Sequence, residues 1–274
     1  MKIEKPAVLS AHPVELTVRQ RVMETLADIE AEHDVRVLFA CESGSRGWGF
    51  ASPDSDYDVR FLYVHRLPWY LGVEAKRDVI ERPISDELDV GGWELRKALR
   101  LLRRSNPTLL EWLDSPIVYR EDPEAASRLC ALAPAFFSPQ RGRYHYLAMA
   151  RKNFREHLLG ETVRLKKYLY VLRPLLAVRW IDRGLGMPPM RFADLASAMV
   201  DDPVLLDEIN GLLAVKMRAG EAECGPRWPA IHDFIAGELE RASADRLADF
   251  RKPEGDAILL DAYLMETVLS PSPE

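Results

Sequence analysis

Two aspartates separated by one residue are the first candidates for chemistry in this sequence. Asp56 and Asp58 begin residues 56–64, where the alternating pattern DYDVRFLYV predicts a strand. Side chains alternate between the faces of a strand, so both carboxylates point to one face. Two such carboxylates repel each other unless cations neutralise them. Magnesium accepts hard oxygen ligands and keeps positions open for phosphates, so the pair predicts a magnesium site, with manganese as an alternative ion.

A Gly-Ser pair precedes the aspartates and has the chemistry of a phosphate contact. Gly44 and Ser45 follow residues 35–41, an apolar and β-branched run that predicts a buried strand. Glycine lets the backbone approach a phosphate closely, and the serine hydroxyl and amide can donate to its oxygens. We therefore expect both residues to bind the phosphates of a nucleotide.

A third acid, Asp89, lies in a later apolar run at residues 87–90. If this run pairs beside the strand with Asp56 and Asp58, the three carboxylates form a triad. Two-metal phosphoryl transfer needs such a group, because one ion activates an attacking hydroxyl while the other holds the triphosphate. Catalysis then consists mostly of positioning and charge neutralisation.

The first half of the chain contains the elements that must position these residues. The pattern predicts a helix at 17–32, strands at 35–41, 56–64, 78–80 and 87–90, and helices at 93–102 and 108–113. Residues 115–139 are rich in proline and turn formers, with one short helix at 124–131. We place a domain boundary there, which gives expected domains of 1–125 and 126–274.

The second half reads as entirely helical. Helical spacing covers residues 144–159, 163–183, 191–198, 204–218 and 229–249, with Pro174 expected to kink or split the second helix. The fold class expected is therefore α+β, with a short mixed sheet flanked by helices followed by an all-helical domain. We expect the helical domain to close a nucleotide cleft.

Basic residues are concentrated between residues 141 and 191, where only Glu156, Glu161 and Asp182 oppose them. Within this stretch Lys166 and Arg173 share one side of a helix, and Lys167 lies about a hundred degrees round. One of the two lysines, together with Arg173, is expected to bind the triphosphate. A solvated basic face is the alternative.

Three other interpretations stay open from the residues alone. Arg46 either reaches a phosphate or is a solvated charge at a helix start. Arg60 shares the face of Asp58, as a partner of the carboxylates or as a plain surface ion pair. The basic residues of the helix after Asp89 form either a solvent face or a path for a nucleic-acid backbone; these are Arg96, Lys97, Arg100, Arg103 and Arg104.

Composition sets the remaining limits. The net charge of −6 argues against non-specific coating of nucleic acid, although the basic middle suits a local polyanion such as a nucleoside triphosphate or an RNA end. No apolar run reaches the roughly 20 residues of a membrane span. The three widely spaced cysteines fit a reducing compartment, so we expect a cytoplasmic protein without a membrane partner.

The string GSRGWGFASPDSDYDV resembles the Gly-Ser and Asp-x-Asp pattern of the DNA polymerase beta-like nucleotidyltransferases. The strings ELDVGGWELRKAL, LLRRSNPTLLEWLDSPIVY and KKYLYVLRPLLAVRW are similar to one bacterial and phage branch, RlaP, predicted to act in RNA repair. The resemblance implies a polymerase-beta-like fold. It also implies that Asp56 and Asp58 bind two metal ions, that Asp89 binds the catalytic ion and orients or deprotonates the acceptor hydroxyl, and that Gly44 and Ser45 hold the triphosphate.

The reaction expected is transfer of a nucleoside monophosphate from a nucleoside triphosphate such as ATP to an acceptor hydroxyl, with release of pyrophosphate. An RNA or tRNA 3′ end is the first choice of acceptor, because of the branch resemblance and the basic middle. A protein hydroxyl and an aminoglycoside-like small molecule are the alternatives. A catalytically idle nucleotide-binding module of a toxin–antitoxin pair is the rival from another class.

Overall fold

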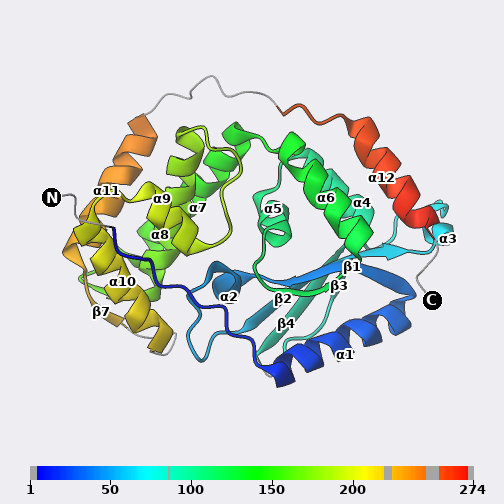
Figure 1. The fold of residues 1–274 in the computed structure, drawn as a ribbon, viewed down its shortest axis with the longest axis horizontal. Coiled ribbons are helices and arrows are strands. Elements are labelled where there is room, and N and C mark those ends of the chain that lie inside the picture. Colours follow the sequence, from blue (N-terminus) through cyan, green and yellow to red (C-terminus); the bar gives the residue numbers. More distant parts are fainter. Residues whose placement is uncertain (1–4, 86, 219–223, 245–252, 271–274) are drawn as a thin grey trace. The chain divides into compact units, whose positions relative to one another are not determined.

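The computed structural model describes residues 5–85, 87–218, 224–244 and 253–270 (Figure 1). The chain groups into two compact units. We name Pro13–Gly47, Asp56–Phe137 and Pro253–Glu274 the sheet unit, and Met1–His12, Trp48–Ser55 and Ser138–Lys252 the helical unit. None of the described helices is both long enough and apolar enough to cross a bilayer.

A five-stranded mixed sheet forms the centre of the sheet unit. Its strands are β1 (Val35–Glu42), β2 (Tyr57–His65), β3 (Val79–Glu81), β4 (Leu88–Glu94) and β5 (Val118–Glu121). Their order is β3-β4-β2-β1-β5, and β2 and β4 run parallel while the other neighbours are antiparallel. This mixed sheet with helices on both sides confirms the expected α+β fold class.

Helices cover both faces of this sheet (Figure 1). On one face, α1 (Leu16–His33) packs its apolar residues against the inward side of β2, in a core that includes Leu26, Ile29, Val59 and Phe61. The opposite face is covered by α4 (Leu95–Arg103), α5 (Pro107–Leu113), α6 (Pro123–Phe136) and α12 (Ala257–Leu269). Two short helices, α2 (Gly44–Trp48) and α3 (Leu67–Tyr70), follow the ends of β1 and β2.

The helical unit is built around α8, whose side chains are mostly buried. Its elements are α7 (Pro139–His157), β6 (Thr162–Arg164), α8 (Lys166–Asp182), α9 (Phe192–Met199), α10 (Pro203–Arg218), β7 (Cys224–Pro226) and α11 (Pro229–Ala244). The antiparallel pair of β6 and β7 was not expected in this half. Pro174 lies inside α8, which continues through it, so the helix is not split, and the alternative of a kink stays a prediction.

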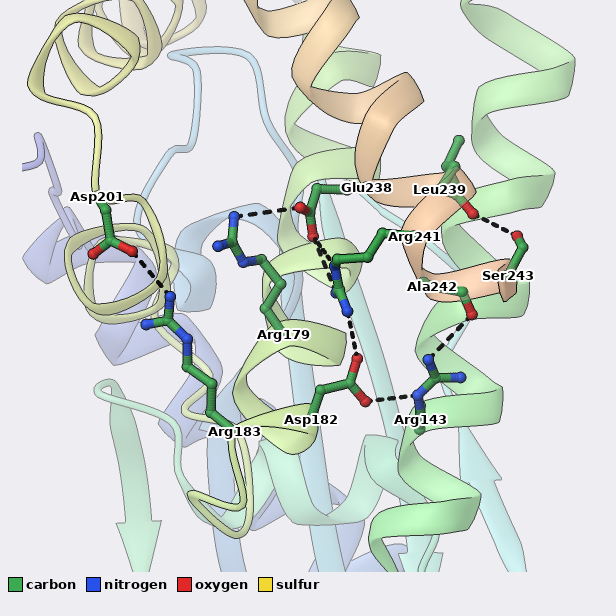
Figure 2. Close-up of polar contacts among 10 residues, drawn as sticks. All are labelled: Arg143, Arg179, Asp182, Arg183, Asp201, Glu238, Leu239, Arg241, Ala242 and Ser243. Atoms are coloured by element: carbon green, nitrogen blue, oxygen red, sulfur yellow. Dashed lines mark hydrogen bonds and ion pairs between the residues drawn. The ribbon is translucent and has the colours of Figure 1, made fainter. Parts of the chain in front are cut away.

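Much of the basic middle is paired within the helical unit (Figure 2). Asp182 accepts from Arg143 at 2.6 Å and from Arg241 at 3.2 Å, and Glu238 pairs with Arg179 at 3.4 Å. Glu238 comes from α11, far along the chain from the basic stretch. At Arg143 and Arg179 the basic stretch is therefore paired within the unit rather than solvated.

Two features of the sheet unit differ from the sequence expectation. Trp93 lies in β4, not in the following helix, because β4 continues through Glu94 and the Glu94 side chain caps α4 by accepting from the amide of Lys97. The boundary expected after residue 125 falls inside α6, and β5 precedes that helix where only turns were expected. The described units divide the chain after Phe137, and α12 returns to the sheet unit.

Candidate active site

The turn between β1 and α2 brings Gly44 against an aspartate. Gly44 has a φ of 57°, a left-handed conformation that glycine adopts without strain. The amide of Ser43 donates to the carbonyl of Asp58 at 2.8 Å. A Cβ atom on Gly44 would lie 1.9 Å from Oδ2 of Asp58, so any side chain there would displace the carboxylate. Ser45, the next residue, is buried on α2.

Asp58 and Asp89 face each other across neighbouring strands. β2 and β4 pair in parallel with Asp58 directly opposite Asp89. Register partners in a sheet lie on the same face, so both carboxylates point to the side covered by the later helices. The condition set by the sequence is therefore met: the run that contains Asp89 is a strand, and it lies beside the strand of Asp58.

Arg60 joins the two carboxylates. Its Nη2 lies 3.1 Å from Oδ1 of Asp58 and 2.7 Å from Oδ2 of Asp89. Its Nη1 donates to the carbonyls of Val59 and Asp89. The interpretation of Arg60 as a partner of the carboxylates is confirmed. The side chains of Asp58 and Asp89 remain 29% and 34% exposed, so a ligand can reach them.

Asp56 lies one residue before β2, which begins at Tyr57 rather than at residue 56 as expected. Its side chain is exposed. Among the described residues, no group of three or more His, Cys, Asp and Glu side chains is placed to hold a metal ion. The structure thus brings Asp58 and Asp89 together, without Asp56 as a third ligand.

The carboxylate pair fits a divalent cation in charge and donor type. Asp58 and Asp89 already share one positive group, the guanidinium of Arg60, which lies where their negative charges meet. Hard carboxylate oxygens are the ligands that magnesium prefers. A bound cation there would compete with Nη2 of Arg60 for the same oxygens.

Comparison with known proteins identifies the family. Residues 18–266 match the model of the RNA repair pathway DNA polymerase beta family, RlaP. The chain belongs to this family. It is accordingly a nucleotidyltransferase of the DNA polymerase beta type.

Two further proteins are similar to parts of this chain. The chain is 49% identical over 224 residues to uncharacterized protein YcgL of Bacillus subtilis (strain 168). The matched residues make up 82% of this chain and 86% of that protein. A crystal structure of a nucleotidyltransferase-like protein from Exiguobacterium sibiricum 255-15 is 14% identical, with a TM-score of 0.30, over 92% of this chain and 76% of that one.

Glu42 is a residue of this candidate site that the sequence analysis missed. It is fully buried at the end of β1. Its Oε1 accepts from the amide of Asp58 at 2.7 Å, and its Oε2 accepts from the hydroxyl of Tyr119 at 2.5 Å. Burial raises the pKa of Glu42 to about 7. An acid at the end of the apolar run VRVLFACE was the available signal, because a buried acid needs partners.

Arg46 is buried, so its interpretation as a solvated charge was wrong. Its Nε donates to the carbonyl of Asp56 at 3.3 Å, its Nη1 donates to the carbonyl of Pro13 at 3.3 Å, and its guanidinium lies 3.8 Å from the ring centroid of Tyr57. Arg46 therefore supports the chain that enters β2. Its predicted phosphate contact stays a prediction.

The predicted triphosphate ligands of the second half lie on α8, in the helical unit. Lys166 and Lys167 are half-buried in its first turn, and the ammonium of Lys167 lies 5.1 Å from the ring of Tyr170. Arg173 is buried, donates from Nε to the carbonyl of Met190 at 3.1 Å, and lies 4.6 Å from the ring of Trp48. For Arg173 the solvated face was wrong, while the phosphate role of all three stays a prediction.

Lys216 is a second residue that the sequence analysis missed. It lies on α10 and is buried, and its Nζ lies 2.6 Å from Oγ of Ser52 and 3.4 Å from Oγ of Ser55. The two serines close the turn that precedes Asp56, because the amide of each bonds to the other. Lys216 therefore anchors this turn within the helical unit.

Proposed function

We propose that this chain transfers a nucleoside monophosphate from a nucleoside triphosphate to the hydroxyl at an RNA or tRNA 3′ end. The observation that carries the proposal is the pair of Asp58 and Asp89, opposite each other on parallel strands beside the Gly44 turn. A negative, partly exposed site next to a glycine turn suits a cation-assisted reaction on phosphates. Family membership supports nucleotidyl transfer.

The reaction forms one bond and breaks one. The acceptor oxygen attacks the α-phosphorus, and the bond from that phosphorus to the β-phosphate oxygen breaks to release pyrophosphate. Asp89 is the proposed acceptor for the proton of the attacking hydroxyl. Asp58 and Asp89 would hold magnesium, which would neutralise the negative charge that gathers on the phosphates, and Asp56 stays the third ligand predicted from the sequence.

The protein contributes mainly a fixed geometry to this chemistry. Both backbone groups of Asp58 are fixed: its amide donates to the Glu42 carboxylate, and its carbonyl accepts from the amide of Ser43. Arg60 keeps Asp58 and Asp89 close together despite their like charges. The backbone of Gly44 and the hydroxyl of Ser45 are the proposed donors to the triphosphate, and the phosphate role of Lys166, Lys167 and Arg173 stays the prediction from the sequence.

The first test is incorporation of label from each α-labelled nucleoside triphosphate into total bacterial RNA, with magnesium, by wild type and Asp58→Ala. Label in a discrete RNA with the wild type alone is the expected result, and it would also identify the nucleotide. Label that enters protein or small molecules instead would overturn the RNA acceptor and identify a protein or a small molecule as the acceptor. Nucleotide binding without pyrophosphate release in any fraction would favour the idle binding module.

A further inference from the structure

A small cavity at the far end of β2 has features that the catalytic site does not use. Its volume is about 300 Å³, at the lower end of the range for small-ligand sites. Its walls come from β2, β3, α3, the end of α1 and the loop between α3 and β3. All of these elements belong to the sheet unit. The side chains that matter are Tyr63, His65, Trp69, Lys76 and Arg77.

One wall of this cavity is aromatic and already ordered. The rings of His65 and Trp69 stack with centroids 4.3 Å apart and planes 9° apart, and Tyr63 packs its edge against His65. Burial, with a smaller contribution from the charge of Lys76, lowers the pKa of His65 to about 4. Its ring is therefore uncharged at neutral pH, and its nitrogens can pair with a polar group of a ligand.

The cavity also contains a polar group without a partner. The hydroxyl of Tyr63 is buried and has no hydrogen-bond partner among the described residues. A buried hydroxyl left unsatisfied is unfavourable, and most such groups in folded proteins are paired. A ligand that can both donate and accept a hydrogen bond would satisfy it, once the side chains that cover the hydroxyl move aside.

Lys76 and Arg77 line the cavity together with one carboxylate, Glu81, and Arg96 lies beside it. Lys76 lies 5.8 Å from the ring of Trp69, and no carboxylate pairs with it in the described part of the chain. Arg77 is exposed and pairs with Glu81. Arg96 of α4 lies 5.3 Å from the ring of Trp69, and Arg100 and Arg103 continue the same side of that helix at spacings of four and three.

We infer that this cavity binds one unpaired nucleotide of the RNA acceptor, with its base against Tyr63, His65 and Trp69 and its phosphate near Lys76. Single-stranded nucleic-acid sites combine aromatic rings with positive charge, and unpaired bases are read by stacking and by hydrogen bonds to their edges. The stripe of Arg96, Arg100 and Arg103 extends the positive surface for neighbouring phosphates. The inference rests on the proposed RNA acceptor.

Distance along the sheet excludes the reacting nucleotide as the occupant. His65 lies about 23 Å from Asp58 along β2, at the usual rise of roughly 3.3 Å per residue. Tyr63 and His65 also lie on the face of the sheet that α1 covers, opposite to Asp58 and Asp89, because side chains alternate along β2. One nucleotide cannot reach both places, whereas a strand of RNA that passes around the β3 edge of the sheet can. The cavity would therefore hold a nucleotide upstream of the 3′ end and would favour long acceptors over small ones.

The test measures binding of a labelled short single-stranded RNA by fluorescence anisotropy, without nucleoside triphosphate or metal. We expect Tyr63→Phe to weaken binding about three- to tenfold, the range for one neutral hydrogen bond, while the variant folds with unchanged or higher Tm. Lys76→Gln should weaken binding and lower the salt slope by about one. The control Lys152→Gln, at an exposed lysine of the helical unit, should bind like wild type.

Other outcomes separate the inference from the proposed function. Wild-type binding that neither Tyr63→Phe nor Lys76→Gln changes would overturn the cavity as the RNA site and leave the RNA acceptor standing. Displacement of the RNA by AMP or UMP at equal nucleotide concentration would show that the cavity takes free nucleotides instead. No RNA binding by the wild type would overturn both the inference and the RNA acceptor.

Discussion

Two clusters of charged side chains, one in each compact unit, differ in how far they are open to water. In the helical unit, Arg143 is 4% exposed, and its partner Asp182 is 18% exposed. At the ends of β2 and β4, Asp58 and Asp89 share Arg60 and remain 29% and 34% exposed. The first cluster is closed and holds helices together, whereas the second leaves carboxylate oxygens accessible. Exposure of like charges, rather than the number of ion pairs, therefore distinguishes the candidate site from the scaffold.

The largest effect expected from this comparison is the loss of activity in Asp58→Asn. The substitution removes a charge from the accessible pair, and we expect nucleotidyl transfer to fall at least about a thousandfold, or roughly 4 kcal/mol in the activation barrier. Folding should change little, because the amide can still accept from Arg60. Pyrophosphate release and a thermal melt on the same preparation measure the two effects. Activity within tenfold of wild type would remove Asp58 from the catalytic group.

The opposite pattern is expected for Asp182→Asn in the closed cluster. Arg143 would keep its buried position without a charged partner, which costs about 3 kcal/mol or more in the free energy of unfolding. For a chain of this size each kcal/mol lowers Tm by roughly 2–4 °C, so a fall of about 6–12 °C is expected. Activity per folded molecule at low temperature should stay within twofold. A catalytic defect without loss of stability would contradict the division into site and scaffold.

Glu42 lies between these two cases, because it is closed to water yet holds the backbone of Asp58. Burial raises the pKa of Glu42 to about 7 from an unfolded value of 4.5, so the folded protein binds the extra proton between these pH values. Its free energy of unfolding should therefore fall as pH rises through this window, by at most on the order of 3 kcal/mol.

Glu42→Gln tests this pH effect directly. The amide stays uncharged and can still pair with Asp58 and Tyr119, so the decrease in stability between pH 4.5 and 7 should be absent from the variant. Urea denaturation of both proteins across this range measures the difference. Glu42→Ala serves as a second variant, in which loss of both hydrogen bonds should lower kcat about tenfold through a displaced Asp58. Parallel pH curves for wild type and Glu42→Gln would show that Glu42 does not bind this proton.

The sequence was sufficient for the parts of the site that depend on local pattern. Gly44, Asp58 and Asp89 lie at or beside the ends of short apolar strands that the local pattern predicts, whereas the shared face of Asp58 and Asp89 follows from the parallel register of β2 and β4. The condition that their strands pair could be stated but not proved, because pairing is a long-range event. Arg60 was found for the same local reason, since it lies two residues after Asp58.

The parts that were missed depend on residues far apart in the chain. Glu42 accepts from Tyr119 on β5, a short strand in a segment that reads as turns. The basic middle looked unpaired because Glu238 lies outside it, on α11. Likewise, α12 returns to the sheet unit, where Arg36 donates to the carbonyl of Thr267. No local pattern encodes these contacts, because each depends on how distant segments pack.

The smallest effect is expected for Lys216→Met, which tests whether a closed charge in the helical unit can still influence the acids. Methionine keeps most of the buried stem and removes the ammonium that anchors the turn of Ser52 and Ser55. The turn leads directly into Asp56, so a looser turn should lower kcat/KM about three- to fivefold, or on the order of 1 kcal/mol. Stability should be unchanged or higher, because a buried ammonium is poorly solvated.

The matched control, Lys152→Met, removes an exposed ammonium from the same unit and should alter neither quantity. A loss near a thousandfold in Lys216→Met would instead assign Lys216 to the triphosphate, since anchoring a turn through two hydroxyls cannot account for so large a change.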